Sequence, residues 1–251
     1  MIADRLNPVV LITGVSARAG AAFTRILSSR AQGGLILTDA DGNALAAVAD
    51  ELESRGAVPE RVSTLAFDAA DEARWGQAEA FIGSQYGRLD WAIIDLSAAP
   101  PPADSDLVQW GRPSSPAIDT AYLSLRAVMR LMQTNSNGGA VIVTAPAALL
   151  SGADAVLPRL VTSASREAAH DNIRINTLVL DPGDTWPQAP HFDDLVRQGR
   201  SERAALDLIT AMAAPAVRYA GGDITPLAAI LLSDASPLTG ATLIVDGGHA
   251  L

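Results

Sequence analysis

The sequence predicts a single α/β domain, with a doubly wound, mostly parallel sheet of seven strands and helices on both faces. Short apolar runs of strand length recur along the 251 residues and alternate with segments that carry apolar residues at helical spacing. Runs such as 9–12 and 141–143 are continuously apolar, which is typical of strands covered on both faces. With 49% hydrophobic residues, the chain can bury a large core. We therefore expect one domain over residues 1–251.

The alternation of short apolar runs with segments of helical spacing locates each expected strand and helix in the sequence. The expected strands are 9–13, 35–38, 62–67, 91–95, 140–144, 175–180 and 241–245. The expected helices are 43–55, 72–86, 118–132 and 160–170, with a further helix-compatible segment directly after residue 21. Residues 100–115 are rich in Pro, Ser and Asp and indicate a surface loop. A variable segment, about 184–222, precedes the last strand, where we expect a cover over a ligand pocket.

Composition excludes several classes of protein. The net charge is -10 without a basic stripe, which disfavours nucleic acid as a partner. Cysteine is absent, so disulfides, thiolate catalysis and cysteine metal sites are excluded, and no three residues suggest a metal site. The apolar run at 8–12 is too short for a signal peptide or a membrane span. We expect a cytoplasmic protein without a membrane segment.

All 18 basic residues are arginine, so the chain contains no lysine. A strong genomic codon bias explains this absence without reference to function. Whatever the origin of this absence, no lysine amine is available for binding or catalysis.

A glycine-bearing turn follows the first expected strand. It reads TGVSARAGA over residues 13–21 and leads into a helix-compatible segment. Such a turn offers unpaired backbone N–H groups and the positive end of a helix dipole to a pyrophosphate. The alternative is a plain tight turn without a ligand. As a phosphate site, the turn is expected to use Thr13, Gly14, Ser16, Arg18 and Gly20.

Two aspartates follow the next two strands. Asp39 closes the second strand at the spacing where a carboxylate accepts hydrogen bonds from the adenosine ribose. It would repel a 2′-phosphate, which favours NAD over NADP. The alternative is a helix cap, since Asp39 or Asp41 can equally cap the helix near residue 43. Asp68, after the third strand, is expected to hold the adenine amino group or to cap the next helix.

Several segments fall in the pattern of one known family. They are LLSDASPLTGATLIVDGG at 231–248, IRIN at 173–176, Pro182-Gly183, Leu89-Asp90, Gly138-Gly139 and Arg126-Ala127-Val128. Together with the glycine turn, they make the chain resemble the short-chain dehydrogenase/reductase family over nearly its whole length. The resemblance implies a Rossmann-type fold and an NAD-dependent oxidoreductase ancestry. It also places Pro182 and Gly183 beneath the nicotinamide.

The chain departs from this family at the nucleotide turn and after the fourth strand. The middle glycine of the family's turn falls on Arg18, whose side chain can crowd the pyrophosphate or pair with it. NAD binding is therefore expected to be weak or lost. The family's Asn-Asn-Ala-Gly segment falls on residues 94–97, which loses amides that hold the central sheet. Ile94 is interpreted as core.

The family's catalytic residues are missing as well. The resemblance places its paired serines on Ala145 and Pro146 and its helix-four asparagine near Ala117. The stretch 147–159 is about nine residues too short, and the missing part would have carried the catalytic tyrosine and lysine. A free phenol, with a pKa of about 10, is a poor base at neutral pH without such a lysine. The tyrosines of the chain, residues 86, 122 and 219, lie elsewhere.

Four side chains are candidates to replace the lost groups. Ser151 and Asp154 lie in the shortened stretch, and Asp154 is also explained as a helix N-terminal carboxylate. His170 is placed at the far end of helix five, where it complements the helix dipole. His191 lies in the variable segment, where it is the histidine most able to face a ligand; the alternative is a solvated loop histidine.

Two functions from different classes follow. The first is a catalytically inactive subunit that pairs with an active homologue, or binds a nucleotide or metabolite without turnover. The resemblance implies a dimer or tetramer, homo- or hetero-oligomeric, formed through helices four and five and the C-terminal segment. The second is an active NAD-dependent oxidoreductase for a small alcohol or carbonyl compound, with a non-standard proton donor, since positioning alone can preserve some rate of hydride transfer.

Overall fold

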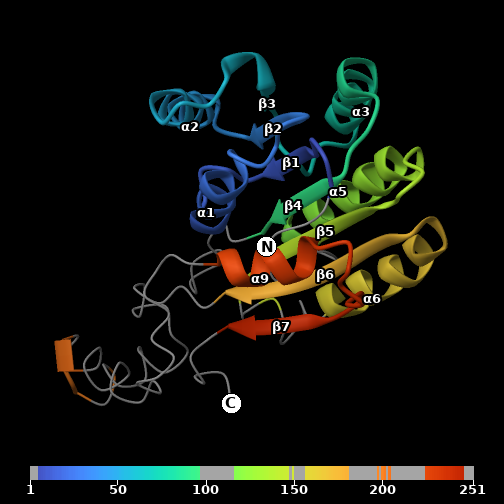
Figure 1. The fold of residues 1–251 in the computed structure, drawn as a ribbon. Helices are drawn as coiled ribbons and strands as arrows, with labels where there is room; N and C mark the ends of the chain where they lie inside the picture. The colour runs from blue at the N-terminus through green and yellow to red at the C-terminus, as the bar shows by residue number, and fades with distance from the viewer. Residues whose placement is uncertain are drawn as a thin grey trace.

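A computed structural model describes residues 5–96, 116–146, 149, 156–180, 197, 199–201, 203–204 and 224–245 of the chain. Strands and helices alternate through this part (Figure 1). The strands are β1 (Val9–Thr13), β2 (Gly34–Asp39), β3 (Val62–Ala66), β4 (Trp91–Asp95), β5 (Gly139–Ala145), β6 (Ile173–Leu180) and β7 (Thr242–Val245). The helices are α1 (Arg18–Leu27), α2 (Gly42–Ser54), α3 (Glu72–Tyr86), α5 (Pro116–Gln133), α6 (Val156–Ala168) and α9 (Thr225–Leu232), with short 3-10 helices η1 (Pro59–Arg61) and η4 (Ala169–Asp171).

The sheet has seven strands in the order β3-β2-β1-β4-β5-β6-β7, and every pairing is parallel. The predicted fold class is therefore confirmed, with a sheet that is parallel throughout. The strand order reverses between β1 and β4. In an open sheet of this kind, ligands bind in the crevice outside the carboxyl ends of the strands at the reversal. The ends of β1 and β4 thus mark the candidate site.

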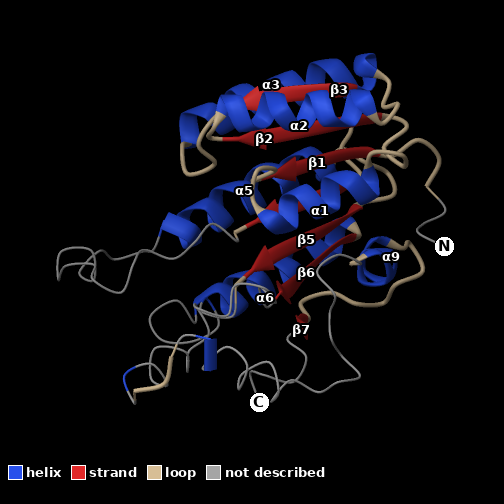
Figure 2. Cartoon of the chain, turned by 90° about the vertical axis from the view of Figure 1, so that its left-hand side faces the viewer, coloured by secondary structure: helices blue, strands red, loops and turns tan. Residues whose placement is uncertain are grey.

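Helices cover both faces of the sheet (Figure 2). On one face, α3, α5 and α6 pack against a cluster that includes Trp75, Val128 and Val161. On the other, α1, α2 and α9 pack against a cluster that includes Phe23 and Leu231. All residues of β1 and β4 are buried. The central strands are therefore held rigidly, and the loops at their carboxyl ends are positioned by a packed core.

The helix α6 begins earlier than the sequence predicted. Residues 156–159 are helical, although we expected them in the shortened loop. Leu157, Val161, Ala164 and Ala168 recur at helical spacing and are buried against the sheet, which explains the longer helix.

In the described residues, no helix is long and apolar enough to cross a membrane.

Asn176 fixes the C-terminal segment to β6. Its side-chain amide donates to the carbonyl oxygen of Leu238 at 2.9 Å, and its Oδ1 accepts from the backbone N–H of Ala241 at 3.1 Å. The amide of Gly240 in turn donates to the carbonyl of Ile175 at 2.7 Å. The IRIN segment that resembles the family is therefore a structural joint between β6 and the chain that leads into β7.

Candidate nucleotide-binding site

The turn after β1 is closed by a hydrogen bond between its own backbone groups. Gly14 has a φ of 64°, a left-handed conformation that favours glycine, and its carbonyl accepts from the Ala17 amide at 3.0 Å. A Cβ on Gly20 would lie 2.1 Å from the Gly14 carbonyl oxygen. No side chain fits there without movement of the backbone. Both glycines are thus required by the shape of the turn itself, with or without a ligand.

The helix α1 begins at Arg18 without a side-chain cap. Its N-cap residue, Ala17, makes no side-chain hydrogen bond, and its first turn contains no acidic residue. The positive end of the helix dipole therefore faces the crevice between β1 and β4. The backbone of Arg18 is described but its side chain is not, so both expected effects of this side chain remain predictions.

A side chain that the sequence analysis did not assign to the site lies at this helix end. The carboxylate of Asp95, the last residue of β4, accepts from the Gly20 amide at 2.6 Å through Oδ2. Its Oδ1 accepts from the Thr144 hydroxyl at 2.6 Å, and its own amide donates to Thr13 Oγ1 at 3.1 Å. Asp95 therefore joins β1, β4, β5 and α1. Its hydrogen bonds hold the central sheet at the place where the family pattern has the amides of its Asn-Asn-Ala-Gly segment.

The neighbouring residue, Ile94, is completely buried and is a core residue, as predicted. The signal for Asp95 was present in the sequence, as an acidic residue where the family pattern has an amide.

Asp39 ends β2 and lies next to the turn after β1. Its Oδ2 accepts from the Ser16 amide at 2.8 Å, and its Oδ1 accepts from the Asp41 amide at 3.0 Å. The cap of α2 is Asp41, whose side chain accepts from the amides of Asn43 and Ala44. Asp39 therefore does not cap this helix. Each carboxylate oxygen has a second lone pair, so the side chain can still accept from ribose hydroxyls.

Asp68 is exposed in the turn between β3 and α3, and its carboxylate accepts from the Ala70 amide at 2.9 Å. The cap of α3 is Asp71, which accepts from the amides of Ala73 and Arg74. The capping role considered for Asp68 is therefore wrong. Its contact with an adenine amino group stays a prediction.

The positions that the resemblance aligns with the family's serines and asparagine carry alanine and proline, at the end of β5 and the start of α5. Ala145 ends β5, is buried at 1% exposure and lies opposite Val179 of β6. The next residue is Pro146, which has no N–H. Ala117, in the first turn of α5, packs against the hydrophobic core. Neither alanine nor proline offers a side-chain hydrogen bond donor to a carbonyl substrate.

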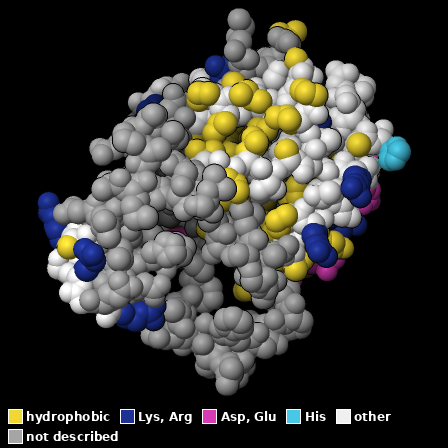
Figure 3. All heavy atoms as spheres, turned by 90° about the horizontal axis from the view of Figure 1, so that it is seen from below, with side chains coloured by type: hydrophobic (Ala, Val, Ile, Leu, Met, Phe, Trp, Pro, Cys, Tyr) yellow, Lys and Arg dark blue, Asp and Glu magenta, His cyan; other side chains and the backbone are white. Residues whose placement is uncertain are grey.

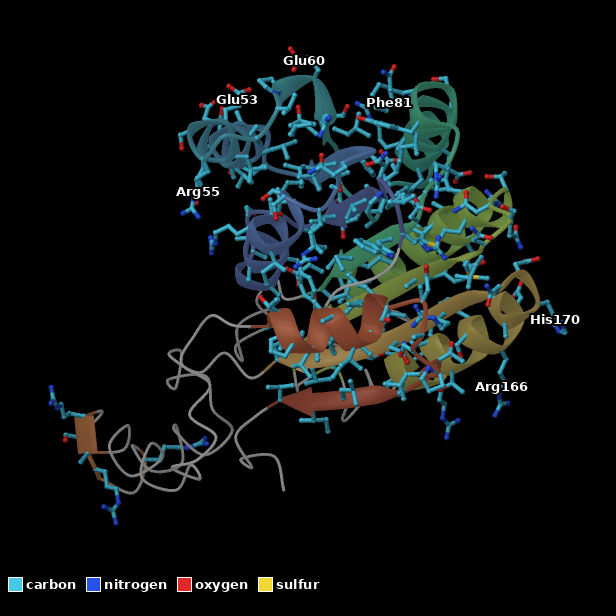
Figure 4. The ribbon with its side chains drawn as sticks, viewed as in Figure 1. Glu53, Arg55, Glu60, Phe81, Arg166 and His170 are labelled. Atoms are coloured by element: carbon cyan, nitrogen blue, oxygen red, sulfur yellow. The ribbon has the colours of Figure 1, made fainter. Side chains whose placement is uncertain are left out.

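The described tyrosines and the described histidine lie away from the crevice. The hydroxyl of Tyr86 is 2.7 Å from Ser63 Oγ, on β3. Tyr122 is half exposed on α5, with the guanidinium of Arg126 5.6 Å from its ring centre. His170 projects outward from η4, in the connection that enters the amino end of β6 (Figure 4). Its predicted place at the end of the helix is confirmed, and it lies at the wrong edge of the sheet for catalysis.

Other predicted residues lie outside the described part of the chain. They are Ser151, Asp154, Pro182, Gly183, His191 and Tyr219, together with nearly all of the variable segment. Among the residues that the structure does describe, no group of three acidic or histidine side chains can hold a metal ion.

The strand order, the glycine turn and the helix N-terminus at the strand reversal define a nucleotide-binding type of α/β domain. Residues 19–250 match the family model described as enoyl-(acyl carrier protein) reductase. The chain belongs to the short-chain dehydrogenase/reductase family, as its resemblance predicted.

Three known proteins illustrate the relationship. An A-factor type gamma-butyrolactone 1'-reductase (1S-forming) of Streptomyces virginiae is 28% identical, over 100% of this chain and 97% of the relative. A cis-4-hydroxycyclohexanecarboxylate dehydrogenase of Sinomonas cyclohexanicum is 27% identical, over 96% of each chain. A solved NAD+-bound xylitol dehydrogenase superimposes with a TM-score of 0.75 at 20% identity, over 96% of this chain and 98% of the other. The last likeness concerns the fold alone.

Proposed function

We propose that this chain is a member of the family without the family's hydride-transfer chemistry, and that it serves as a non-catalytic subunit. One observation carries the proposal: the end of β5 presents Ala145 and Pro146, in a chain that contains no lysine anywhere. A tyrosine supplied by an undescribed segment would keep a pKa of about 10 without a lysine beside it, and would be a poor proton donor and acceptor at neutral pH.

The retained surfaces support a role in assembly. Helices α5 and α6, which are helices four and five of the sequence analysis, carry the half-exposed Tyr122 and Val156 on their outer faces. The edge strand β7 exposes Ile244, and hydrophobic side chains gather on the side of the molecule seen from below, where β7 lies (Figure 3). We propose that these surfaces form a dimer or tetramer, with a second copy or with an active homologue.

The adenosine end of the crevice supports a residual preference for NAD. Asp39 places a carboxylate at the end of β2, where it repels a 2′-phosphate, and both of its oxygens are fixed by backbone amides. The xylitol dehydrogenase whose fold is similar was solved with NAD+ bound. In this proposal, any nucleotide in the crevice is NAD or a fragment of it, bound without turnover.

A turnover assay tests the loss of chemistry. Purified chain at high concentration is mixed with NADH and a panel of small ketones and aldehydes, and with NAD+ and the corresponding alcohols. We expect no change in NADH absorbance above the rate without enzyme. Turnover of any pair, abolished by removal of the chain, contradicts the proposal.

Native mass spectrometry of the protein purified from its source tests the subunit role. We expect a complex that contains this chain and a second, tyrosine- and lysine-bearing member of the family. A protein found only as a monomer or as a homo-oligomer contradicts the pairing with an active homologue.

The alternative is an active NAD-dependent oxidoreductase with a different proton donor. It is favoured by the two relatives, which are named as a reductase and a dehydrogenase and which this chain matches over nearly its whole length. The turnover assay separates the two functions, because the alternative requires a rate that depends on both NADH and a carbonyl substrate.

A further inference from the structure

The outward face of α6 carries two exposed arginines. Leu157, Val161 and Ala164 point inward and pack against the sheet. At 3.6 residues per turn, Arg159 and Arg166 then lie on the opposite side of the helix, two turns apart, and both are exposed. Figure 4 shows Arg166 projecting away from the helix. The residues of this face form the α6 stripe: Arg159, Thr162, Ser163 and Arg166.

Neither arginine of the stripe has a salt bridge or hydrogen bond in the part of the chain that the structure describes. On the adjacent helix α5, by contrast, Arg126 is paired with Glu72 of α3 at 2.5 Å. The positions three and four residues before and after each arginine of α6 hold no carboxylate. Glu167 directly follows Arg166, which places it about 100° away around the helix. Within the described residues, the stripe therefore presents two positive charges without a carboxylate beside them, on a chain whose net charge is -10.

A groove of about 400 Å³ lies along the stripe. Its lining consists of Pro158, Arg159, Thr162, Ser163 and Arg166. The short side chains of Thr162 and Ser163 lie between the two long arginines. The Thr162 hydroxyl is turned back to its own helix, where it donates to the Pro158 carbonyl at 2.8 Å. The arginines are therefore the charged groups that a partner meets in this groove.

The charges of the stripe disfavour a second copy of this chain. A twofold axis brings one patch of surface onto the same patch of the other copy. The midpoint of the stripe lies at Thr162 and Ser163, so a symmetric pair of antiparallel α6 helices places Arg159 of each copy opposite Arg166 of the other. Like charges across an interface oppose association. An acidic surface reverses the sign of both contacts.

We propose that the α6 stripe is a docking surface for an acidic face of a different protein chain, and that its charge excludes a second copy. This inference deepens the proposed function and rests on its pairing of this chain with another member of the family, whose contacting surface it assigns as acidic. The half-exposed Tyr122 on α5 and Ile244 on β7 lie outside the stripe and stay available to a second copy.

Sedimentation velocity tests the stripe with the protein itself as the probe. The variant Arg159→Glu/Arg166→Glu carries the acidic counterpart of the stripe on the same helix, and it is mixed in equal amounts with the parent at about 0.1 M salt. We expect the mixed pair to associate at least about tenfold more tightly than the parent associates with itself, because two oppositions of like charge become two Arg–Glu pairs. The additional association should be lost at about 1 M salt, where the screening length falls to about 3 Å.

Two matched controls separate charge at this face from charge in general. Arg25→Glu/Arg74→Glu makes the same change in net charge at exposed positions of α1 and α3, and should bind the parent no more tightly than the parent binds itself. Arg159→Gln/Arg166→Gln removes the charge of the stripe and keeps polar side chains there. It should bind the glutamate variant of the stripe about tenfold more weakly than the parent does.

A mixture that sediments as its two separate components overturns the inference, as does a glutamine variant that binds the glutamate variant as tightly as the parent does. A parent that self-associates, and loses this association in Arg159→Glu/Arg166→Glu, identifies a second copy as the occupant and also overturns it. If the double variant does not fold, as judged by circular dichroism, Arg166→Glu alone is mixed with the parent, and a gain below about threefold decides against the inference. A native complex with an active homologue, found alongside a mixture that does not associate, leaves the proposed function intact.

Discussion

Arg5 Nη1 lies 3.0 Å from Asp90 Oδ1, and both side chains are withdrawn from solvent, at 7% and 0% exposure. The same guanidinium donates to Asp234 and to the carbonyl oxygens of Asn137 and Gly138. Asp90 also accepts the amide of Val9 at 2.8 Å. This buried network ties the residues before β1 and β4 to the C-terminal segment, and it explains why Leu89-Asp90 falls in the family pattern.

Asp90→Ala should be among the most destabilising single changes in the chain. It leaves the buried Arg5 guanidinium with Asp234 as its remaining charge partner and the buried Val9 amide without its acceptor, at a cost of about 3–5 kcal/mol in the free energy of unfolding. Arg88→Ala, which removes the outer cation of the same network, should cost less than about 1 kcal/mol because 45% of that side chain is exposed. Urea unfolding at a fixed protein concentration measures both, and equal losses would contradict the assignment of Arg5 as the main partner.

The turn after β1 should not tolerate a methyl group. Gly20→Ala forces Cβ against the Gly14 carbonyl, 2.1 Å away, and should destabilise the protein by about 3 kcal/mol. Gly76→Ala, on the exposed face of α3 with no neighbour within 4 Å, should stabilise it by about 0.5–1 kcal/mol. Thermal unfolding of the two variants should therefore move in opposite directions. A neutral Gly20→Ala would show that the turn opens readily.

The joint between β6 and the C-terminal segment should depend on one amide. Asn176→Ala leaves the Leu238 carbonyl and the Ala241 amide without their partners, and should cost about 2 kcal/mol. Asn43→Ala, exposed in the first turn of α2, is the control and should stay within about 0.5 kcal/mol of the parent. Hydrogen exchange should show lost protection of β7 in Asn176→Ala, and unchanged protection there would contradict this role.

The fold was predictable because burial and chain direction leave few choices. Continuous apolar runs mark β1 and β4, whose bounds agree with the prediction, since both faces of these strands are covered. Helix α3 also agrees at both ends, where Asp71 caps it and Gly87 ends it in a left-handed conformation. The start of α6 was predicted at residue 160, whereas the helix begins at Val156, because its first turn was assigned to the shortened connection.

The candidate site was predictable only in its outline. The motif located the turn, and the sequence placed Ala145 and Pro146 at the end of β5 in a chain without lysine. The hydrogen bond between the turn and Asp95 could not be predicted, because Asp95 and Gly20 are 75 residues apart and meet only when β4 pairs with β1. The sequence left the cap of α2 open between Asp39 and Asp41, and the structure shows Asp41; for α3 it offered Asp68, whereas the cap is Asp71, three residues further along the chain.

The proposed assembly surface should be sensitive to charge on α5. Tyr122→Glu places a carboxylate on the half-exposed face of this helix, and should shift the protein toward a smaller assembly in sedimentation velocity. Val58→Glu, a similarly exposed hydrophobic position between α2 and η1, should leave the sedimentation coefficient unchanged. Identical profiles for the parent and Tyr122→Glu, at every protein concentration, would exclude this face of α5 from the interface.

The adenosine end should discriminate against a 2′-phosphate through Asp39. Its carboxylate is fixed by the amides of Ser16 and Asp41, so it cannot turn away from a phosphate on the ribose. We expect the parent to bind adenosine about tenfold more tightly than 2′-adenosine monophosphate, because the added phosphate meets a like charge. Asp39→Asn should narrow this ratio to about threefold or less, whereas Asp50→Asn should preserve it. Calorimetry gives both constants, and an unchanged ratio in Asp39→Asn would remove Asp39 from the recognition of the ribose.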